Sequence, residues 1–229
     1  MIVAAHSAPH DSCFLCSHQS GGEDVAWYDR PIMRSEGVGT AVCAVGALVP
    51  GYLLVSPAQH ESSVQALTRP TAVAFLSFLA DVHATVERHF GPTTIFEHGS
   101  CRSEERRRSA CISHSHVHLV PGRYALEQLG LPVRRFETLT GIVDIPPTER
   151  NQGYLMYREP DGMVCYAPDA GISQFFRRHI AKMLGRPDEW DYALFPDWAN
   201  LRATQEALGS GSAPQQFVRA RETDELLSA

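Results

Sequence analysis

The chain has 229 residues, of which 44% are hydrophobic, so it is long enough for one sizeable core and too short for several full domains. Its formal net charge of -6 gives no general reason to bind nucleic acid, and its longest apolar stretch, residues 41–50, is far shorter than a membrane span. The opening residues lack the basic leader and apolar run of a signal peptide. We therefore expect a cytoplasmic protein with reduced thiols and with neither a nucleic-acid nor a membrane partner.

The N-terminal half has the pattern of an antiparallel sheet interrupted by one helix. Residues 1–24 are polar, and we expect no regular structure there except where Cys13-Phe14-Leu15-Cys16 is held by a ligand. Apolar residues at helical spacing after Pro70 and before Gly91 predict a helix over residues 71–89. Runs rich in β-branched, aromatic and small apolar residues predict strands, at residues 25–33, 40–48, 52–55, 93–97 and 110–120.

The C-terminal half has weaker patterns. A hairpin is expected at residues 153–158 and 163–167, around the turn Pro160-Asp161-Gly162, and a helix at residues 173–184. The sequence GSGSAPQQ after Gly209 is typical of a linker. We expect an α+β fold with an antiparallel sheet of about five strands and packed helices. The expected units are a catalytic domain, an extension packed on it and a flexible tail, at residues 1–122, 123–208 and 209–229.

Three histidines alternate with other residues in the run His114-Ser115-His116-Val117-His118-Leu119-Val120. On a strand that rises about 3.3 Å per residue, such side chains share one face and are rooted about 6.6 Å apart. A lone histidine is most often a core or solvent-exposed residue, but three in one row indicate a site. Imidazole can bind a metal, move a proton or act as a nucleophile.

A second motif is Cys13-x-x-Cys16. Two thiolates at this spacing fit one edge of a tetrahedral zinc site, which then needs two more ligands from elsewhere. A redox pair and two ordinary reduced cysteines are the alternatives. The nearby His10 or His18 could also complete a local site.

The histidine run resembles the motif of the histidine triad superfamily of nucleotide hydrolases and transferases. The segment GYLLVSPAQH, which ends at His60, is similar to that family's strand ending in Pro-x-x-His. The resemblance covers about residues 13–121. It implies a histidine-triad-like fold, a homodimer and a small nucleotide substrate, either a dinucleoside polyphosphate, a nucleoside phosphoramidate or a related conjugate.

The resemblance implies that His116 and His118 are catalytic. His116 would attack the α-phosphorus and form a covalent nucleotidyl-imidazole, which water or another acceptor then takes, while His118 would lie beside the phosphate oxygens or the scissile bridge. A neutral ring nitrogen is a competent nucleophile near pH 7. The resemblance also implies a structural Zn²⁺, held by Cys13, Cys16, His60 and His114.

Two departures from the family bear on substrate binding. Residues 44–49 contain no acid, whereas many members hold the ribose hydroxyls with one there. We expect the leaving group to be contacted by Glu97, His98 or an arginine loop that includes Arg107. At the start of the second helix, Gln174 and Arg177 are expected to contact the phosphates. The alternatives are a solvated loop and a helix that only packs.

Two other functions stay open at this point. The histidine row could hold a catalytic metal in a hydrolase or oxygenase, although no carboxylate at matching spacing completes such a set. The chain could also be an inactive, zinc-stabilised nucleotide-binding protein, although all three histidines are present.

Overall fold

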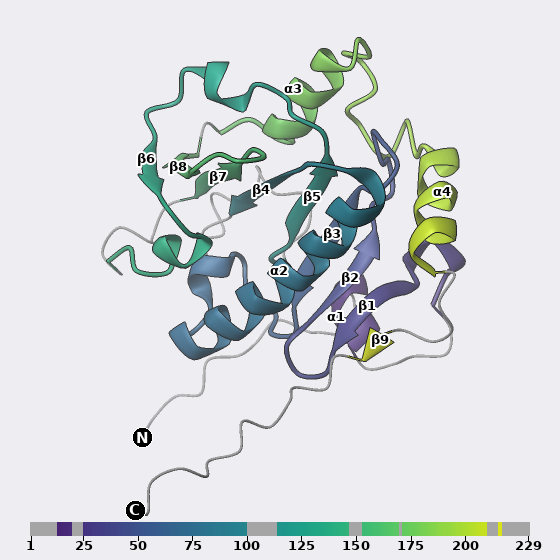
Figure 1. The fold of residues 1–229 in the computed structure, drawn as a ribbon, viewed down its shortest axis with the longest axis horizontal. Coiled ribbons are helices and arrows are strands. Elements are labelled where there is room, and N and C mark those ends of the chain that lie inside the picture. The colour runs from purple at the N-terminus through teal and green to yellow at the C-terminus, as the bar shows by residue number, and fades with distance from the viewer. Residues whose placement is uncertain are drawn as a thin grey trace, which may run out of the picture.

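One sheet connects most of the chain in the computed structural model, which describes residues 13–19, 25–99, 114–146, 153–169, 171–209 and 215–216 (Figure 1). Within these ranges the sheet has nine strands in the order β6-β8-β7-β4-β5-β3-β2-β1-β9. All neighbours pair antiparallel except β1 and β9, which are parallel. The strands are β1 (Pro31–Ser35), β2 (Gly39–Cys43), β3 (Leu53–Pro57), β4 (Thr93–Gly99), β5 (Val117–Pro121), β6 (Arg134–Phe136), β7 (Tyr154–Arg158), β8 (Val164–Pro168) and β9 (Gln215–Gln216).

Helices cover both faces of this sheet. The α-helices in the described ranges are α1 (Phe14–Gln19), α2 (Arg69–Phe90), α3 (Phe175–Met183) and α4 (Trp198–Gly209). Short 3-10 helices are η2 (Trp27–Asp29), η3 (Val64–Ala66), η5 (Leu126–Leu129) and η6 (Leu139–Ile142). No helix in the described part of the chain combines the length and apolar character needed to cross a membrane.

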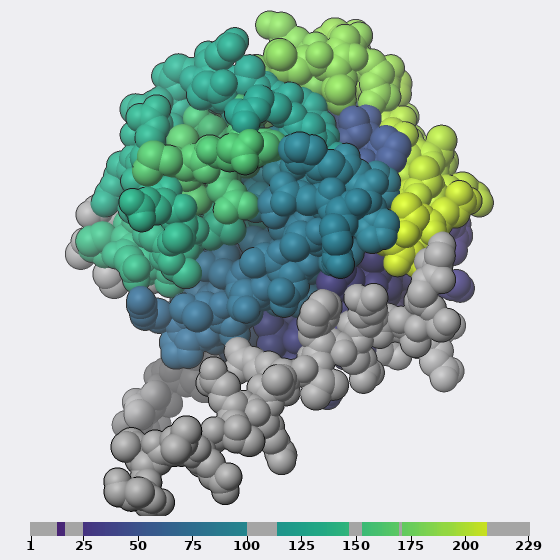
Figure 2. All heavy atoms as spheres, viewed as in Figure 1, coloured from purple at the N-terminus to yellow at the C-terminus, as the bar shows by residue number. Residues whose placement is uncertain are grey.

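Alternate residues of β3 pack on opposite faces, as the two-residue repeat of a strand requires. Leu53 and Val55 belong to one apolar core together with buried side chains of α2. Leu54 belongs to a second core, which includes Leu15 of α1 and Phe176 of α3. Figures 1 and 2 show α2 lying across the middle of the first face.

The long helix α2 confirms the expected helix over residues 71–89. It begins after Thr68, whose side chain accepts a hydrogen bond from the Thr71 amide at 3.4 Å, and Pro70 lies in its first turn. It ends before Gly91, which has φ +87°, a conformation that glycine adopts without strain.

The α+β prediction is confirmed, but the expected count of about five strands is wrong. The predicted C-terminal hairpin, β7 and β8, continues the same sheet, because β7 pairs with β4 from Ile95–Arg158 to Gly99–Tyr154. The strand β6 adds to β8, and the two-residue β9 adds to β1. Such pairings between distant segments leave no trace in local periodicity.

Several element boundaries also differ from the expectation. The helix α1 occupies part of the segment expected to be irregular, and β1 begins only at Pro31, after η2. The histidine strand begins at Val117, so His114 and His116 lie in the irregular segment that leads into β5. Residues 110–113 of the expected strand and the arginine loop lie outside the described residues.

Candidate active site and metal centre

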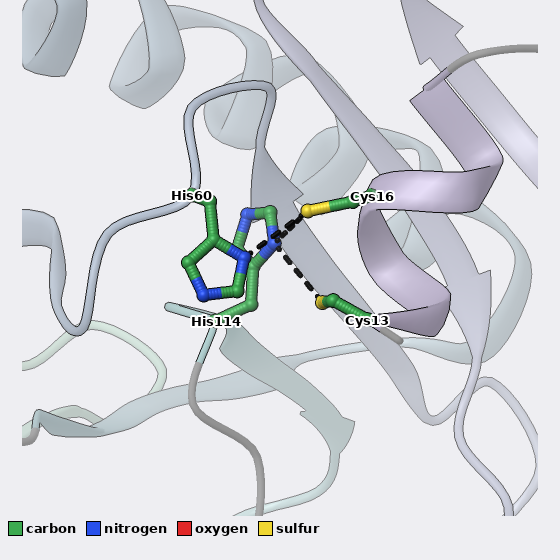
Figure 3. Close-up of side chains that lie close together, drawn as sticks. All are labelled: Cys13, Cys16, His60 and His114. Carbon is green, nitrogen blue, oxygen red and sulfur yellow. Dashed lines mark hydrogen bonds between the residues drawn. The ribbon is translucent and has the colours of Figure 1, made fainter. Parts of the chain in front are cut away.

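Cys13, Cys16, His60 and His114 form one compact cluster (Figure 3). The two cysteines come from the start of α1, His60 from the loop after β3, and His114 from the segment before β5. Their ligand atoms all lie within 4.8 Å of one another. The Cys16 sulfur is 3.1 Å from Nδ1 of His60 and 3.4 Å from Nδ1 of His114, which lies 3.6 Å from the Cys13 sulfur. The structure thus brings together the four residues expected to bind zinc.

The donor set of this cluster fits zinc. Tetrahedral Zn²⁺, with bonds of about 2.3 Å to sulfur and about 2.0 Å to nitrogen, separates neighbouring sulfur and nitrogen ligands by about 3.5 Å. Nε2 of His114 lies 2.9 Å from the Pro57 carbonyl, to which it donates, so the lone pair of Nδ1 points toward the thiols. Burial, together with Cys13, raises the pKa of Cys16 to about 12. A cation would remove this barrier to thiolate formation.

His116 has one ring nitrogen committed and the other available. Its Nδ1 lies 2.8 Å from the His114 carbonyl. A carbonyl only accepts hydrogen bonds, so Nδ1 carries the proton and Nε2 keeps its lone pair. Burial lowers the pKa of His116, which favours the neutral ring. The ring lines a cavity, where a neutral Nε2 can act as a nucleophile.

His118 takes the opposite tautomer. Tyr52 receives a hydrogen bond from Arg177, and burial raises the pKa of Tyr52, so its O–H keeps the proton and donates to Nδ1 of His118 at 2.8 Å. This arrangement leaves an N–H at Nε2. Burial, followed by the charges of His116, Arg177 and His98, holds the pKa of His118 well below its usual range. The ring lines the cavity and stacks on Phe96, with 4.3 Å between centroids.

The cavity beside these two rings measures about 290 Å³, near the lower end of small-molecule sites. Its polar side chains include His98, Gln174 and Arg177, all expected from the sequence to contact substrate. Aromatic side chains from α1, α3 and the segment before α4 complete its walls, among them Phe14, Phe175 and Tyr192.

Arg177 is buried and rigidly held. Its guanidinium donates to the Gly46 carbonyl at 2.8 Å and to the Trp190 carbonyl at 3.0 Å, and it lies 5.5 Å from the centroid of the Tyr52 ring. Gly46 has φ +71°, and a Cβ there would come within 2.5 Å of Tyr192. Glycine therefore allows this close approach, which fixes a positive charge at the cavity wall.

Gln174 begins α3 in a left-handed conformation, with φ +55°. Its side-chain oxygen is enclosed and has no hydrogen-bond partner within the described ranges. Because the residue lines the cavity, this oxygen can accept a hydrogen bond from a bound molecule.

Glu97 lies in a different place from the one expected. It is not among the cavity-lining residues, and its side chain is 1% exposed on the other face of β4. The carboxylate accepts from the Val64 amide at 2.9 Å, from the Ser115 hydroxyl at 3.0 Å and from the Tyr154 hydroxyl. Glu97 thus anchors the residue between His114 and His116. Arg107, also expected to contact substrate, lies outside the described residues.

Sequence analysis missed three polar side chains at this site. Tyr52 and Leu54 are two residues apart on the segment before and within β3, so alternation could have placed Tyr52 on the same face as the cavity-lining Leu54. Asp29, in η2, supplies the acidic side chain of the cavity wall. Asp169 lies just after β8 and contacts His98. Nothing local in the sequence marks either aspartate.

No protein-family model and no curated protein matches this chain. Three solved structures show a partial likeness. A HIT family protein from Bacillus anthracis is 20% identical over 48% of this chain and 73% of that chain, with a TM-score of 0.38. A member of the HIT family from Bacillus subtilis is 19% identical over 60% and 88%, with a TM-score of 0.41. A hypothetical histidine triad nucleotide-binding protein from Sulfolobus tokodaii is 14% identical over 86% and 93%, with a TM-score of 0.40. Values this low do not assign the chain to a family.

Proposed function

We propose that this protein is a nucleotide hydrolase or nucleotidyl transferase of the histidine triad type, in which His116 attacks the α-phosphorus of its substrate. The observation that supports this most directly is the pair of tautomers. The lone pair at Nε2 of His116 and the N–H at Nε2 of His118 belong to neighbouring rings whose centroids lie 4.9 Å apart in one cavity. One ring can form a bond to phosphorus while the next donates to a phosphate oxygen.

The charges and walls of the cavity suit a nucleotide. Phosphoryl transfer depends mainly on positioning and on compensating the charge of the phosphate oxygens. Arg177 supplies a fixed positive charge for this purpose, and the aromatic rings of Phe14, Phe175 and Tyr192 offer faces on which a base can stack. Asp29 offers a carboxylate for the hydroxyl groups of a ribose. We propose that it replaces the acid that residues 44–49 lack.

In this proposal the metal is structural Zn²⁺, held by Cys13, Cys16, His60 and His114. A closed shell of four protein ligands leaves no position for a reacting water, so the ion would supply stability and not catalysis. The three histidines of the row also have three different partners, a pair of thiols, a carbonyl and a hydroxyl. This does not favour a catalytic metal bound by the whole row.

The test is covalent capture. Purified protein is mixed with adenosine 5′-phosphoramidate or a dinucleoside polyphosphate and quenched, and its intact mass is measured. We expect a gain of one nucleotidyl group, mapped to His116 by peptide analysis. His116→Ala should form no adduct and keep its zinc, whereas the matched variant His89→Ala, on the exposed side of α2, should form the adduct normally. An active wild type without adduct, or a His116→Ala variant that loses both zinc and activity, would contradict the nucleophile assignment.

A further inference from the structure

His98 and Asp169 form an enclosed pair at the cavity. Nε2 of His98 donates to the Asp169 carboxylate at 2.8 Å, and the two side chains are 11% and 18% exposed. The same carboxylate oxygen accepts from the Gly171 amide at 2.9 Å, and the Asp169 amide donates to the Gly153 carbonyl at 2.9 Å. The ends of β7 and β8 therefore fix the carboxylate, which in turn orients the imidazole.

Sheet register places His98 opposite the nucleophile. Phe96 of β4 pairs with His118 of β5 in an antiparallel ladder. Two residues further along β4 comes His98, and two residues earlier in the other chain segment comes His116. Facing residues of an antiparallel pair have Cβ atoms about 5 Å apart, and both of these rings line the cavity. His98 is thus a second imidazole next to the reacting centre.

We propose that His98 is the acid that protonates the leaving group, with Asp169 as its positioning residue. This inference rests on the proposed function. As Nε2 of His116 forms its bond to phosphorus, the bond to the leaving oxygen or nitrogen breaks, and the leaving atom takes that electron pair and a proton from Nδ1 of His98. In the second step His98 takes a proton from the attacking water or acceptor hydroxyl. The electron pair of the phosphorus–nitrogen bond then returns to His116.

The neighbouring groups are less suited to this step. The proton on Nε2 of His118 belongs to a neutral ring, whose other nitrogen already accepts from Tyr52. Arg177 does not give up a proton near neutral pH. Among the described residues, His98 makes no hydrogen bond besides that to Asp169, and this carboxylate compensates the charge of an imidazolium. Its Nδ1 is therefore available for a substrate.

Two substrates with the same nucleotidyl group test the inference. The oxygen of a 4-nitrophenyl ester of adenosine 5′-monophosphate leaves as a stable anion, whereas the nitrogen of adenosine 5′-phosphoramidate must be protonated. For His98→Asn, kcat on the phosphoramidate should fall by about a hundredfold or more, and kcat on the ester by less than about threefold. Asp169→Asn should show the same selectivity with a smaller loss, and Asp169→Glu should recover part of it. Thermal unfolding checks that each variant is folded.

The outcomes separate the two proposals. Equal losses on both substrates for His98→Asn would overturn the acid role and leave His98 as a binding residue. Equal losses for Asp169→Asn would make Asp169 merely structural. Asp29→Asn provides the matched control, because a group that binds the shared nucleoside should affect both substrates by the same factor. If the wild type releases no nitrophenolate and forms no adduct with the ester, the proposed function fails instead.

Discussion

Each imidazole of the row has a different tautomer because each meets a different partner. His114 and His116 both donate to carbonyl groups, but through opposite ring nitrogens. His118 accepts from a hydroxyl. The chemistry of each ring is therefore decided by a neighbour that the alternation of histidines does not reveal. Spacing predicts which rings are close, and the partners determine which nitrogen is free.

Asp29 provides a residue-scale test of substrate recognition. Burial raises the pKa of Asp29, which indicates a carboxyl group withdrawn from solvent at the cavity wall. Asp29→Asn should lower kcat/KM for a ribonucleotide substrate by roughly tenfold, because one hydrogen bond to a charged acceptor is lost. The same variant should change kcat/KM much less for the substrate lacking both ribose hydroxyls. Equal losses on the two substrates would show that Asp29 does not recognise these hydroxyls.

The pH dependence of stability tests the environment of His118. Its pKa in the folded protein is lowered, so the unfolded chain binds more protons below the ordinary histidine pKa of about 6.5. His118 should therefore reduce the free energy of unfolding as pH falls below about 6.5, by at most about 1.4 kcal/mol per pH unit. Urea unfolding between pH 7.5 and 5, with zinc in excess, measures this slope.

The variant His118→Phe keeps an aromatic ring against Phe96 and removes the titrating group. Its free energy of unfolding should fall less steeply than that of the wild type as the solution is acidified. Parallel curves for the two proteins would mean that His118 contributes nothing to the acid sensitivity.

At the scale of elements, α1 depends on its metal ligands. A six-residue helix is too short to be stable by itself, and α1 carries both cysteines and the cavity-lining Phe14 between them. Cys16→Ser should therefore lose one equivalent of zinc, unfold at a temperature lower by roughly 5 °C or more, and show a raised KM. Metal analysis and thermal unfolding measure these effects. Cys165→Ala, in the core beside β7, should keep its zinc, and zinc retained by Cys16→Ser would contradict the assignment.

Local patterns predicted individual elements better than their partners. The periodicity between Pro70 and Gly91 gave α2 almost to its ends, and the turn at Pro160-Asp161-Gly162 gave the β7–β8 hairpin. The pairing of that hairpin with β4 depends on side chains more than fifty residues apart, which no local window contains. The helix α1 was not expected because its stability comes from a tertiary cluster and not from its own residues.

The candidate site divides in the same way. Its histidines and cysteines were predicted because their spacing within short motifs resembles a known family. Asp29, Tyr52 and Asp169 were not, because strand pairing and loop packing bring them to the cavity from separate parts of the chain. Glu97 was predicted on the wrong face, since a motif position does not say which way a side chain of β4 turns.

At the scale of the whole molecule, the expected division at residue 122 can be tested directly. A fragment of residues 1–122 lacks β7, which pairs along β4, and α3, which packs in the second core. We expect this fragment to show no cooperative unfolding transition in urea. A fragment of residues 1–209, which keeps both elements, should unfold cooperatively. A folded, cooperative 1–122 fragment would instead support an independent catalytic domain.

The contacts of Arg177 have a kinetic consequence. Its guanidinium joins a helix of the last third of the chain to the carbonyl of Gly46, 131 positions away. Ordering so long an intervening stretch is slow compared with forming a helix such as α2. During refolding from denaturant, helical signal should therefore recover first, and turnover should return only with the final phase.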